Sequence, residues 1–447
     1  MVASEARTGR MVEFSSREQL VRAVAAAALA STVGWYDFFL FGYAAATVLG
    51  PLFFPTSSPF LSALLAVTTY AVGFAVRPVG AFLFGHLGDR IGRKATLTAT
   101  LLLAGLATSL VAAAPTYAEA GVLAGIVLVL LRLAQGLAVG GQWAGSALLA
   151  VEWGHRGRRG FVGSWAQVGL PAGLALAYGS MQFFTSLMGA DTGWRIPFLL
   201  CIALIAVALY IRIGVRETPV FTQLLAERRI ESAPVSEVLV RQWREVLLTA
   251  LLRVGQQTAF LLFTVFVLDD AGALRLQRSG VLVLVLVTAA VSVVALPAWG
   301  FLSDVVGRRR LVMIGAAAML LWSYPYWALL DSHVPLLVLV AVLLSLPIHD
   351  LQYAPQAALI AESFTGRLRY SGTALGSQLT TLLADGPAIL VAFALLHRSG
   401  DPRVLALYLG AAALVTLVAA AALKDRSRQD MSAEYDDPAL APSPARS

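Results

Sequence analysis

Long apolar stretches alternate with short polar segments along almost the entire chain of 447 residues. A helix needs roughly 20 mostly apolar residues to cross the hydrocarbon core of a membrane. The pattern therefore predicts an all-α polytopic membrane protein with 12 transmembrane helices. The expected spans are residues 22–50, 60–84, 95–114, 120–150, 161–187, 194–213, 245–268, 279–302, 310–330, 334–361, 371–396 and 403–423.

Two of these stretches contain features that bear on the prediction. The first includes AAAALAS, which resembles a signal-peptide cleavage site, but its apolar character continues to Gly50. That length exceeds the apolar region of a signal peptide, so we expect a retained helix. In the tenth stretch Pro347 precedes His349 and Asp350, and we expect a broken helix at mid-depth there.

Composition supports a membrane protein and excludes several other classes. Hydrophobic residues make up 58% of the chain and charged residues 13%, about half the usual charged share of roughly 25% in soluble domains. The mean hydropathy is +0.76. The single Cys201 cannot form an intrachain disulfide, and the five histidines lack metal-binding spacing. We therefore expect no metal, no cofactor and no enzymatic activity.

The distribution of Lys and Arg predicts the orientation of the chain in the membrane. If the N-terminus is cytoplasmic, the inner loops hold 17 basic residues and the outer loops five. This asymmetry follows the positive-inside rule and places both termini in the cytoplasm. The net charge of +7 thus reflects orientation in a lipid bilayer, and we expect no nucleic-acid partner.

A few charged residues lie inside the predicted spans. A charge at the centre of a membrane helix costs at least about 2.5–3.5 kcal/mol, so such residues usually face a cavity or a partner. They serve either a binding or coupling role or a static ion pair, and the sequence leaves both open. They are Arg77, Arg132, Arg253, Asp37, Asp350 and Asp385.

One loop motif occurs twice. GHLGDRIGRKATL (85–97) and GFLSDVVGRRRLV (300–312) share G-x-L-x-D-x-x-G-R-[KR] at an offset of 215 residues, close to half the chain. The repeat predicts two six-helix bundles, residues 22–213 and 245–423, joined by a cytoplasmic linker, 214–244, with cytoplasmic tails at 1–21 and 424–447. The candidate functional residues within the motif in the two halves are Gly85, Asp89, Arg90, Gly92, Arg93, Asp304, Gly307 and Arg308.

The chain resembles the major facilitator superfamily, and within it the metabolite:proton symporters that include shikimate, α-ketoglutarate and proline/betaine transporters. The resemblance rests on seven segments. They are WYDFFLFG (35–42), RPVGAFLFGHLGDRIGRK (77–94), LRLAQGLAVGGQWAGSALLAVE (131–152), GWRIPFLL (193–200), RETPVF (216–221), FTVFVL (263–268) and HDLQYAPQAALIAESF to RYSG (349–372).

The resemblance implies two bundles around a central cavity and alternating access driven by protons. It also implies roles for Asp37 as the first-helix carboxylate, for Arg132 as the fourth-span arginine, and for Asp89 with Arg93 as a cytoplasmic gate. Where the family often carries an acid, this chain has Gln142, and a similar exchange is expected at Gln256. Conversely, Asp385 stands where the family usually has a small residue.

These residues suggest a mechanism with open alternatives. Asp37, with Arg132 as its expected partner, is either a proton switch or half of a static ion pair. Asp385 is either a second proton site or the counterion of Arg253. Because a guanidinium can bind a carboxylate through two parallel hydrogen bonds (bidentate binding), we expect a small anionic or zwitterionic substrate. The expected substrate-binding residues are Arg132, Arg253, Gln142, Gln256, Tyr36, Tyr353, Gln356 and Asp350.

The sequence thus predicts a secondary transporter in the inner (plasma) membrane that imports a small organic acid or zwitterion by proton symport. The partners expected are that substrate, protons and lipid, with the protein as a monomer. The alternatives are a proton-coupled exporter and, from another class, a non-transporting membrane sensor. The Pro/Ala/Ser-rich tail after Lys424 has no heptads, and we expect it to be disordered.

Overall fold

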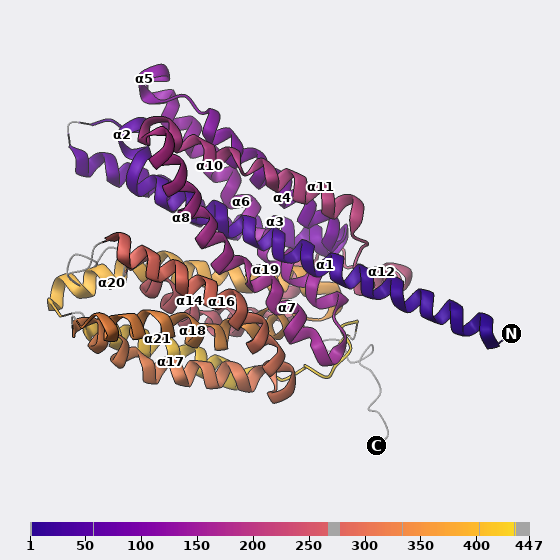
Figure 1. Cartoon of the computed structure of the whole chain (residues 1–447). Helices are drawn as coiled ribbons and strands as arrows, with labels where there is room; N and C mark the ends of the chain where they lie inside the picture. The colour runs from indigo at the N-terminus through magenta and orange to yellow at the C-terminus, as the bar shows by residue number, and fades with distance from the viewer. Residues whose placement is uncertain are drawn as a thin grey trace.

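The computed structural model describes residues 2–434, apart from 57, 267–277, 333, 402 and 433. Within these residues all regular structure is helical. The predicted outer loop that carries Arg275 and the last tail residues, 435–447, lie outside the described part. Figure 1 shows two groups of helices that lie together near α7 and α19 and diverge toward α2 and α20.

The N-terminal group begins with a helix that runs well beyond the predicted first span. Its chain-order elements are α1 Val2–Ala44, η1 Ala45–Leu49, α2 Gly50–Phe53, α3 Pro59–Arg90, α4 Arg93–Ala113, α5 Tyr117–Ala120, α6 Val122–Trp153, η2 Arg156–Arg158, α7 Arg159–Gln167, α8 Gly169–Met188, α9 Ala190–Gly193, α10 Arg195–Leu199 and α11 Ile202–Gly214.

Two short helices, α12 Pro219–Ala226 and α13 Pro234–Arg241, occupy the predicted linker. The C-terminal group follows. Its elements are α14 Trp243–Leu261, η3 Leu262–Phe266, α16 Arg278–Val306, α17 Arg308–Asp331, α18 Pro335–Ser363, η5 Gly366–Leu368, α19 Arg369–Thr380, η6 Thr381–Asp385, α20 Gly386–Ser399 and α21 Arg403–Ala422.

Among the described residues, 11 helices are long and apolar enough to cross a membrane. The remaining predicted span, 161–187, is present as α7 and α8, which are interrupted at Val168. Pro171 has no N–H to donate to the carbonyl of Gln167, which is where α7 ends. The 12 predicted spans are therefore all represented, some of them by more than one helical element.

The tenth span corrects one prediction. Helix α18 is continuous from Pro335 to Ser363 and contains both Pro347 and Pro355, so the expected break at mid-depth is wrong. A proline removes a single backbone hydrogen bond, and a helix packed on several sides tolerates that loss. His349 and Asp350 consequently project from regular helix.

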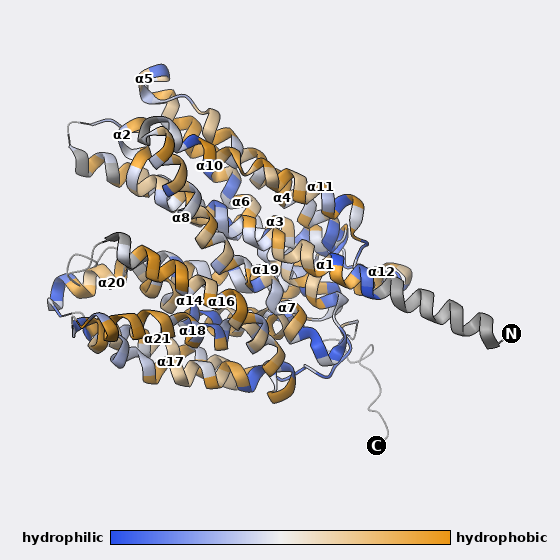
Figure 2. Cartoon of the chain, viewed as in Figure 1, coloured by the Kyte–Doolittle hydropathy of each residue, from blue (hydrophilic) through white to orange (hydrophobic). Residues whose placement is uncertain are grey.

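Small residues bring the helices of each group close together, while large apolar residues face outward. A Cβ added to Gly136 or Gly140 on α6 would lie 2.3 Å from the carbonyl oxygen of Gly73 or Arg77 on α3. Such contacts are typical of membrane helices, because lipid supplies no hydrophobic force between them. On the outside, Ile213 and Val294 are 84% and 73% exposed. Figure 2 shows that hydrophobic residues predominate along the long helices and that hydrophilic residues gather near α12.

The two groups meet mainly at one end of the bundle. We call it the basic end and define it by the loops that hold residues 90–94, 154–159, 307–310 and 364–369. There α3 of the N-terminal group packs on α19 of the C-terminal group, and α7 packs on α16 and α18. At the opposite end, near α2 and α20, the two groups diverge (Figure 1).

Candidate functional site

A cavity lies between the two groups, with about 520 Å³ of space free of protein atoms. Part of that space is open to solvent. Both groups contribute to its wall. The lining residues are Ser31, Gly34, Trp35, Phe38, Arg77, Val139, Gln142, Trp143 and Ser146 from the N-terminal group, and Arg253, Gln257, Ser377, Gln378, Thr381 and Asp385 from the C-terminal group.

Two arginines face this cavity from opposite groups. The guanidinium of Arg253 lies 4.2 Å from the ring centre of Trp143, and that of Arg77 lies 4.4 Å from the ring of Phe74. Both side chains are buried. Nε and Nη1 of Arg253, and Nε of Arg77, donate to no acceptor among the described residues. The aromatic rings thus hold two cations in place and leave N–H groups for an anion.

Asp385 supplies the only carboxylate among the lining residues. It ends the π-helical turn η6, and such turns are frequent at functional sites. Nε2 of Gln257 donates to its Oδ1 at 2.6 Å, and Oγ1 of Thr381 donates to its Oδ2 at 3.0 Å. Within the described residues no ion pair joins Asp385 to Arg253, so amide and hydroxyl donors hold this carboxylate.

Asp37 lies elsewhere, inside the N-terminal group. Arg132 Nη1 is 3.6 Å from its Oδ2, which confirms the predicted pairing. Oγ1 of Thr108 and Nε2 of Gln135 donate to Oδ1 at 2.6 and 2.9 Å. Arg132 also lies 4.4 Å from the ring centre of Phe41. The whole cluster is buried between α1, α4 and α6, and neither Asp37 nor Arg132 lines the cavity.

The sequence reasoning overlooked Gln135 and Thr108. Gln135 follows Arg132 by three residues, so the two side chains share one face of α6. Thr108 is a polar residue within the third apolar stretch. Helical spacing from Arg132 could have identified Gln135, and polarity within an apolar stretch could have identified Thr108.

The other predicted substrate contacts divide between the cavity and the helix interiors. Gln142 lines the cavity, where its Nε2 donates to the carbonyl of Ala30 at 2.8 Å. The hydroxyl of Tyr36 donates to the carbonyl of Pro197 at 2.8 Å. A further four predicted contacts are buried and do not line the cavity: Gln256, Asp350, Tyr353 and Gln356.

At the basic end, the acids of the repeated motif bind backbone amides of the opposite group. Asp89 on α3 accepts from the N–H groups of Tyr370 and Ser371 at 3.0 and 2.8 Å, at the start of α19. Asp304 on α16 accepts from Gly160 and Phe161, both at 2.8 Å, at the start of α7. Carboxylates are favoured at helix N-termini, so each acid joins the two groups.

The motif glycines shape these contacts. Gly92 and Gly307 have φ angles of 112° and 106°, a conformation that favours glycine. A Cβ on Gly85 would lie 3.0 Å from Cα of Ser371, so this position requires a small residue for α3 to approach α19. Among the described residues, the hydrogen-bond partner of Arg90 is His86 of its own helix, at 3.4 Å, and not a residue of the opposite group.

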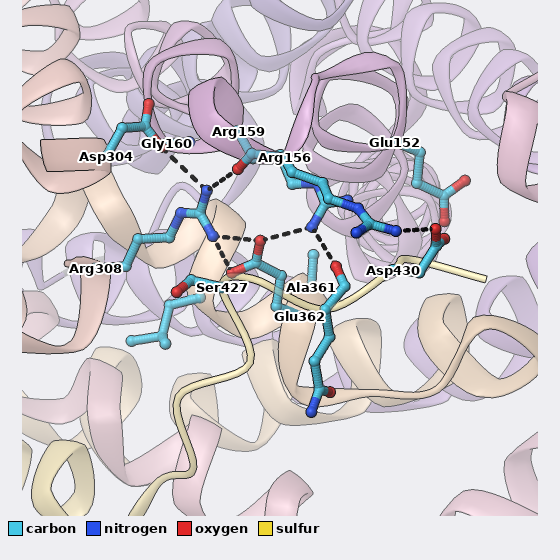
Figure 3. A network of polar contacts seen from close by, with 12 residues as sticks. Glu152, Arg156, Arg159, Gly160, Asp304, Arg308, Ala361, Glu362, Ser427 and Asp430 are labelled. Carbon is cyan, nitrogen blue, oxygen red and sulfur yellow. Dashed lines mark hydrogen bonds and ion pairs between the residues drawn. The ribbon is translucent and has the colours of Figure 1, made fainter. Parts of the chain in front are cut away.

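The motif arginines complete the junction. Arg93 lies 3.3 Å from Asp89 and 3.4 Å from Glu152, and donates to the carbonyl of Gly366 at 2.8 Å. In the matching place, Arg308 pairs with Asp304 at 3.0 Å and with Glu362, and donates to the carbonyl of Arg156 at 3.3 Å. Figure 3 shows this second cluster around Glu362.

Two acid–arginine pairs across the groups were not predicted. Glu152 pairs with Arg369 at 3.5 Å, and Glu362 pairs with Arg159 at 3.2 Å. Burial lowers the pKa of Arg159, while the charge of Glu362 opposes that shift. A second internal repeat would have identified them, because Glu152–Arg159 and Glu362–Arg369 have the same spacing at an offset of 210 residues.

The first part of the C-terminal tail also binds the basic end, so the expectation of disorder is wrong for the described residues 424–432 and 434. Asp430 pairs with Arg156 (Figure 3), and Arg159 donates to the carbonyl of Gln429 at 3.1 Å. Glu434 is buried and lies 2.9 and 2.8 Å from Arg229 and Arg367. The tail therefore contacts the N-terminal group, the linker and the C-terminal group.

Comparisons with known proteins agree with this architecture. The sequence model of the Major Facilitator Superfamily matches residues 27–384. The shikimate transporter of Escherichia coli K12 is 35% identical over 411 residues, 89% of this chain and 93% of the relative. The proline/betaine transporter of the same strain is 29% identical over 439 residues, 95% and 87% of the two chains. A solved structure of the proton:xylose symporter XylE has a TM-score of 0.73 at 16% identity, covering 91% of this chain and 95% of that one.

Proposed function

Because the chain belongs to the major facilitator superfamily and is a multi-span transporter of metabolites rather than an enzyme, we propose that it imports a small organic acid or zwitterion by proton symport. The basic end, with both termini, faces the cytoplasm, as the positive-inside rule requires. The junction at that end then corresponds to a state closed to the cytoplasm, with the cavity accessible from outside.

The observation that carries this proposal is the charge of the cavity. Its wall holds the cations Arg77 and Arg253 and the carboxylate Asp385, so it is one positive charge in excess. The N–H groups of Arg253 without acceptors are buried, and an unpaired buried donor is costly. A substrate carboxylate would supply the missing acceptor. One relative is named as a transporter of shikimate, which is a carboxylate. Another is named as a transporter of proline and betaine, which are zwitterions.

The arrangement of the two arginines also suggests how binding drives transport. Arg77 belongs to α3 and Arg253 to α14, so a substrate that contacts both bridges the two groups. A ligand shifts a conformational equilibrium by its differential affinity for the two states. A substrate that contacts both arginines would draw the two groups together and close the outer end. The free energy of these contacts would offset the loss of ion pairs at the basic end, so that the basic end opens.

Proton coupling belongs to the acids at depth. Protonation of Asp37 would remove the countercharge of Arg132, and protonation of Asp385 would raise the excess positive charge of the cavity. The second effect favours binding of an anion together with a proton. We therefore keep both Asp37 and Asp385 as proton-coupling residues in the proposal.

Reconstitution into proteoliposomes tests the proposed function. With an imposed pH gradient, acid outside, we expect accumulation of at least one labelled compound among shikimate, proline, glycine betaine and simple dicarboxylates. Accumulation should vanish when an uncoupler removes the gradient. A result in which no carboxylate accumulates, while cations leave the vesicles in exchange for protons, would identify an exporter and contradict the proposal.

A further inference from the structure

A second buried acid occurs in the C-terminal group, next to a histidine. His349 and Asp350 are consecutive on α18 and are 0% and 1% exposed. His349 Nδ1 lies 2.9 Å from Asp350 Oδ1, and the other carboxylate oxygen accepts from Ser292 on α16. The second ring nitrogen, Nε2, lies 2.7 Å from Nε2 of Gln256 on α14. Side chains from α14 and α16 thus contact an imidazole–carboxylate pair on α18.

No arginine or lysine neutralises this pair within the described part of the chain. The side chains that face it are Gln256 and Phe260 from α14, Ser292 from α16 and Tyr353 from α18 itself, none of which titrates near neutral pH. From α17 the contact is Gly315 against Leu351 and Gln352, and from α7 it is Gln167 against the carbonyl of Tyr353. The charge of Arg253 interacts with Tyr353 and Asp385, and within the described residues the ion pair of Asp350 is the one with His349.

This environment distinguishes the pair from Asp37 and Arg132. An arginine is always charged, so Asp37 and Arg132 together are neutral without any bound proton. With a neutral imidazole, His349 and Asp350 together carry one negative charge in a membrane interior, where a net charge is costly. Binding one proton makes the pair neutral, so burial of the pair and proton uptake favour each other.

Gln256 can accommodate both protonation states. When the imidazole is neutral, with its hydrogen on Nδ1 facing Asp350, the Gln256 amide donates to Nε2. When Nε2 holds a proton, the amide can turn over so that its oxygen accepts from Nε2–H. That oxygen, Oε1, has no partner among the described residues, so the turn breaks no other bond to it.

The pair also lies next to an aromatic contact between the two groups. The ring of His349 is 5.7 Å from that of Phe260, which is 6.3 Å from the ring of Trp35, a cavity-lining residue on α1. Separation or closure of α1 and α14 at this contact would change the access of water to His349. A change in hydration is the physical cause that would make the pair take up and release a proton during transport.

We propose that His349 and Asp350 form a proton-binding site in the C-terminal group, with the proton held at His349 Nε2 and Gln256 acting as its positioning residue. The inference rests on the proposed proton symport but adds a site outside the substrate cavity. Asp350 then contributes to proton coupling rather than to substrate contact.

A titration of the full-length protein tests the site without altering it. In a variant whose other four histidines are replaced by glutamine, the ¹⁵N signals of His349 report its protonation directly. We expect these signals to change from the neutral to the charged imidazole pattern as the pH falls through the range of transport. An imidazole that stays neutral throughout that range would overturn the proposal.

Proton binding in proteoliposomes supplies the second measurement. A rapid drop in pH without substrate should produce a transient charge displacement on a supported membrane. We expect His349→Gln to abolish most of it and the exposed control His397→Gln to leave it unchanged. Gln256→Met, which cannot accept from Nε2–H, should move its half-maximal point to lower pH. Full displacement in His349→Gln would contradict the site.

The outcomes separate this inference from the proposed function. If gradient-driven accumulation of a carboxylate occurs with an unchanged number of protons in His349→Gln, the function stands and the site is wrong. If His349 titrates but no organic acid or zwitterion accumulates in any condition, the site stands and the substrate class is wrong.

Discussion

The two halves of the molecule each bury one aspartate inside a helix bundle, but they neutralise it differently. In the N-terminal group Asp37 faces a guanidinium, and in the C-terminal group Asp350 faces an imidazole. An arginine keeps its charge at every physiological pH, whereas a histidine gains and loses it near neutrality. The difference teaches that the partner of a buried acid decides what a bound proton does: at Asp37 it would leave Arg132 without a countercharge, whereas at the His349–Asp350 pair it makes the pair neutral.

The largest expected effect comes from breaking the N-terminal pair. Arg132→Gln leaves Asp37 buried without a countercharge, which typically costs about 3–5 kcal/mol. We expect a correspondingly large drop in the unfolding free energy in detergent. The double variant Asp37→Asn/Arg132→Gln should recover much of it, since no isolated charge remains.

The matching change in the C-terminal group should cost less. Asp350→Asn leaves a neutral imidazole beside an amide, so it should lower the unfolding free energy less than Arg132→Gln does. Equal losses would remove the distinction between the halves.

The cavity arginines sharpen the comparison at the level of binding. Arg253→Gln removes charge-assisted hydrogen bonds worth about 1.5–3 kcal/mol, so substrate affinity should fall roughly 10- to 150-fold. Arg253→Lys keeps the charge but loses the planar donor geometry, and we expect an intermediate loss. Binding is measured on purified protein with the compound that accumulates in proteoliposomes. Undiminished affinity in Arg253→Gln would show that the carboxylate binds elsewhere.

The junction at the basic end tests how far the two halves are equivalent. Asp89→Asn and Asp304→Asn each weaken two hydrogen bonds to a helix start of the opposite group. A loss of about 1.4 kcal/mol changes a conformational equilibrium tenfold. The distance between spin labels at the exposed positions Arg158 and Arg310, which lie in opposite groups, should therefore increase in both variants as the basic end opens. Asp331→Asn, an exposed acid paired with Arg403, is the matched control; a change in only one motif variant would show that one half dominates closure.

The smallest effect concerns the C-terminal tail. A hydrogen bond from the Ser432 N–H, with that from Arg156, holds the pKa of Asp430 at about 2. Because this folded-state pKa lies below the usual value near 4, the contact stabilises above that pH and is lost as the pH falls toward 2. The pair is half exposed, so Asp430→Asn should cost under about 1 kcal/mol. Proteolysis of the tail at neutral pH measures the effect, and an undocked tail in the unmodified protein would contradict the structure.

Much of the fold was predictable from the sequence because its determinants are local. Each span depends on the apolar character of some 20 consecutive residues. The division into two related bundles is indicated by a motif that occurs twice. The partner of Asp37 was also predictable, since Arg132 is a cation at depth in the same half. The proline at 347 misled the prediction because packing around α18 compensates for a missing backbone hydrogen bond.

The composition of the site required the tertiary structure. Sequence alone singled out six charged residues at depth, but only the packing of the two groups shows that Arg77, Arg253 and Asp385 share the cavity while Asp37 and Asp350 do not. The cross-group partners Glu152 and Glu362 and the docked tail were missed for the same reason. Hydropathy and charge give the depth of a side chain in the membrane, because burial in lipid is a property of each helix. Which way that side chain faces, and which distant helix meets it, depends on contacts between residues hundreds of positions apart.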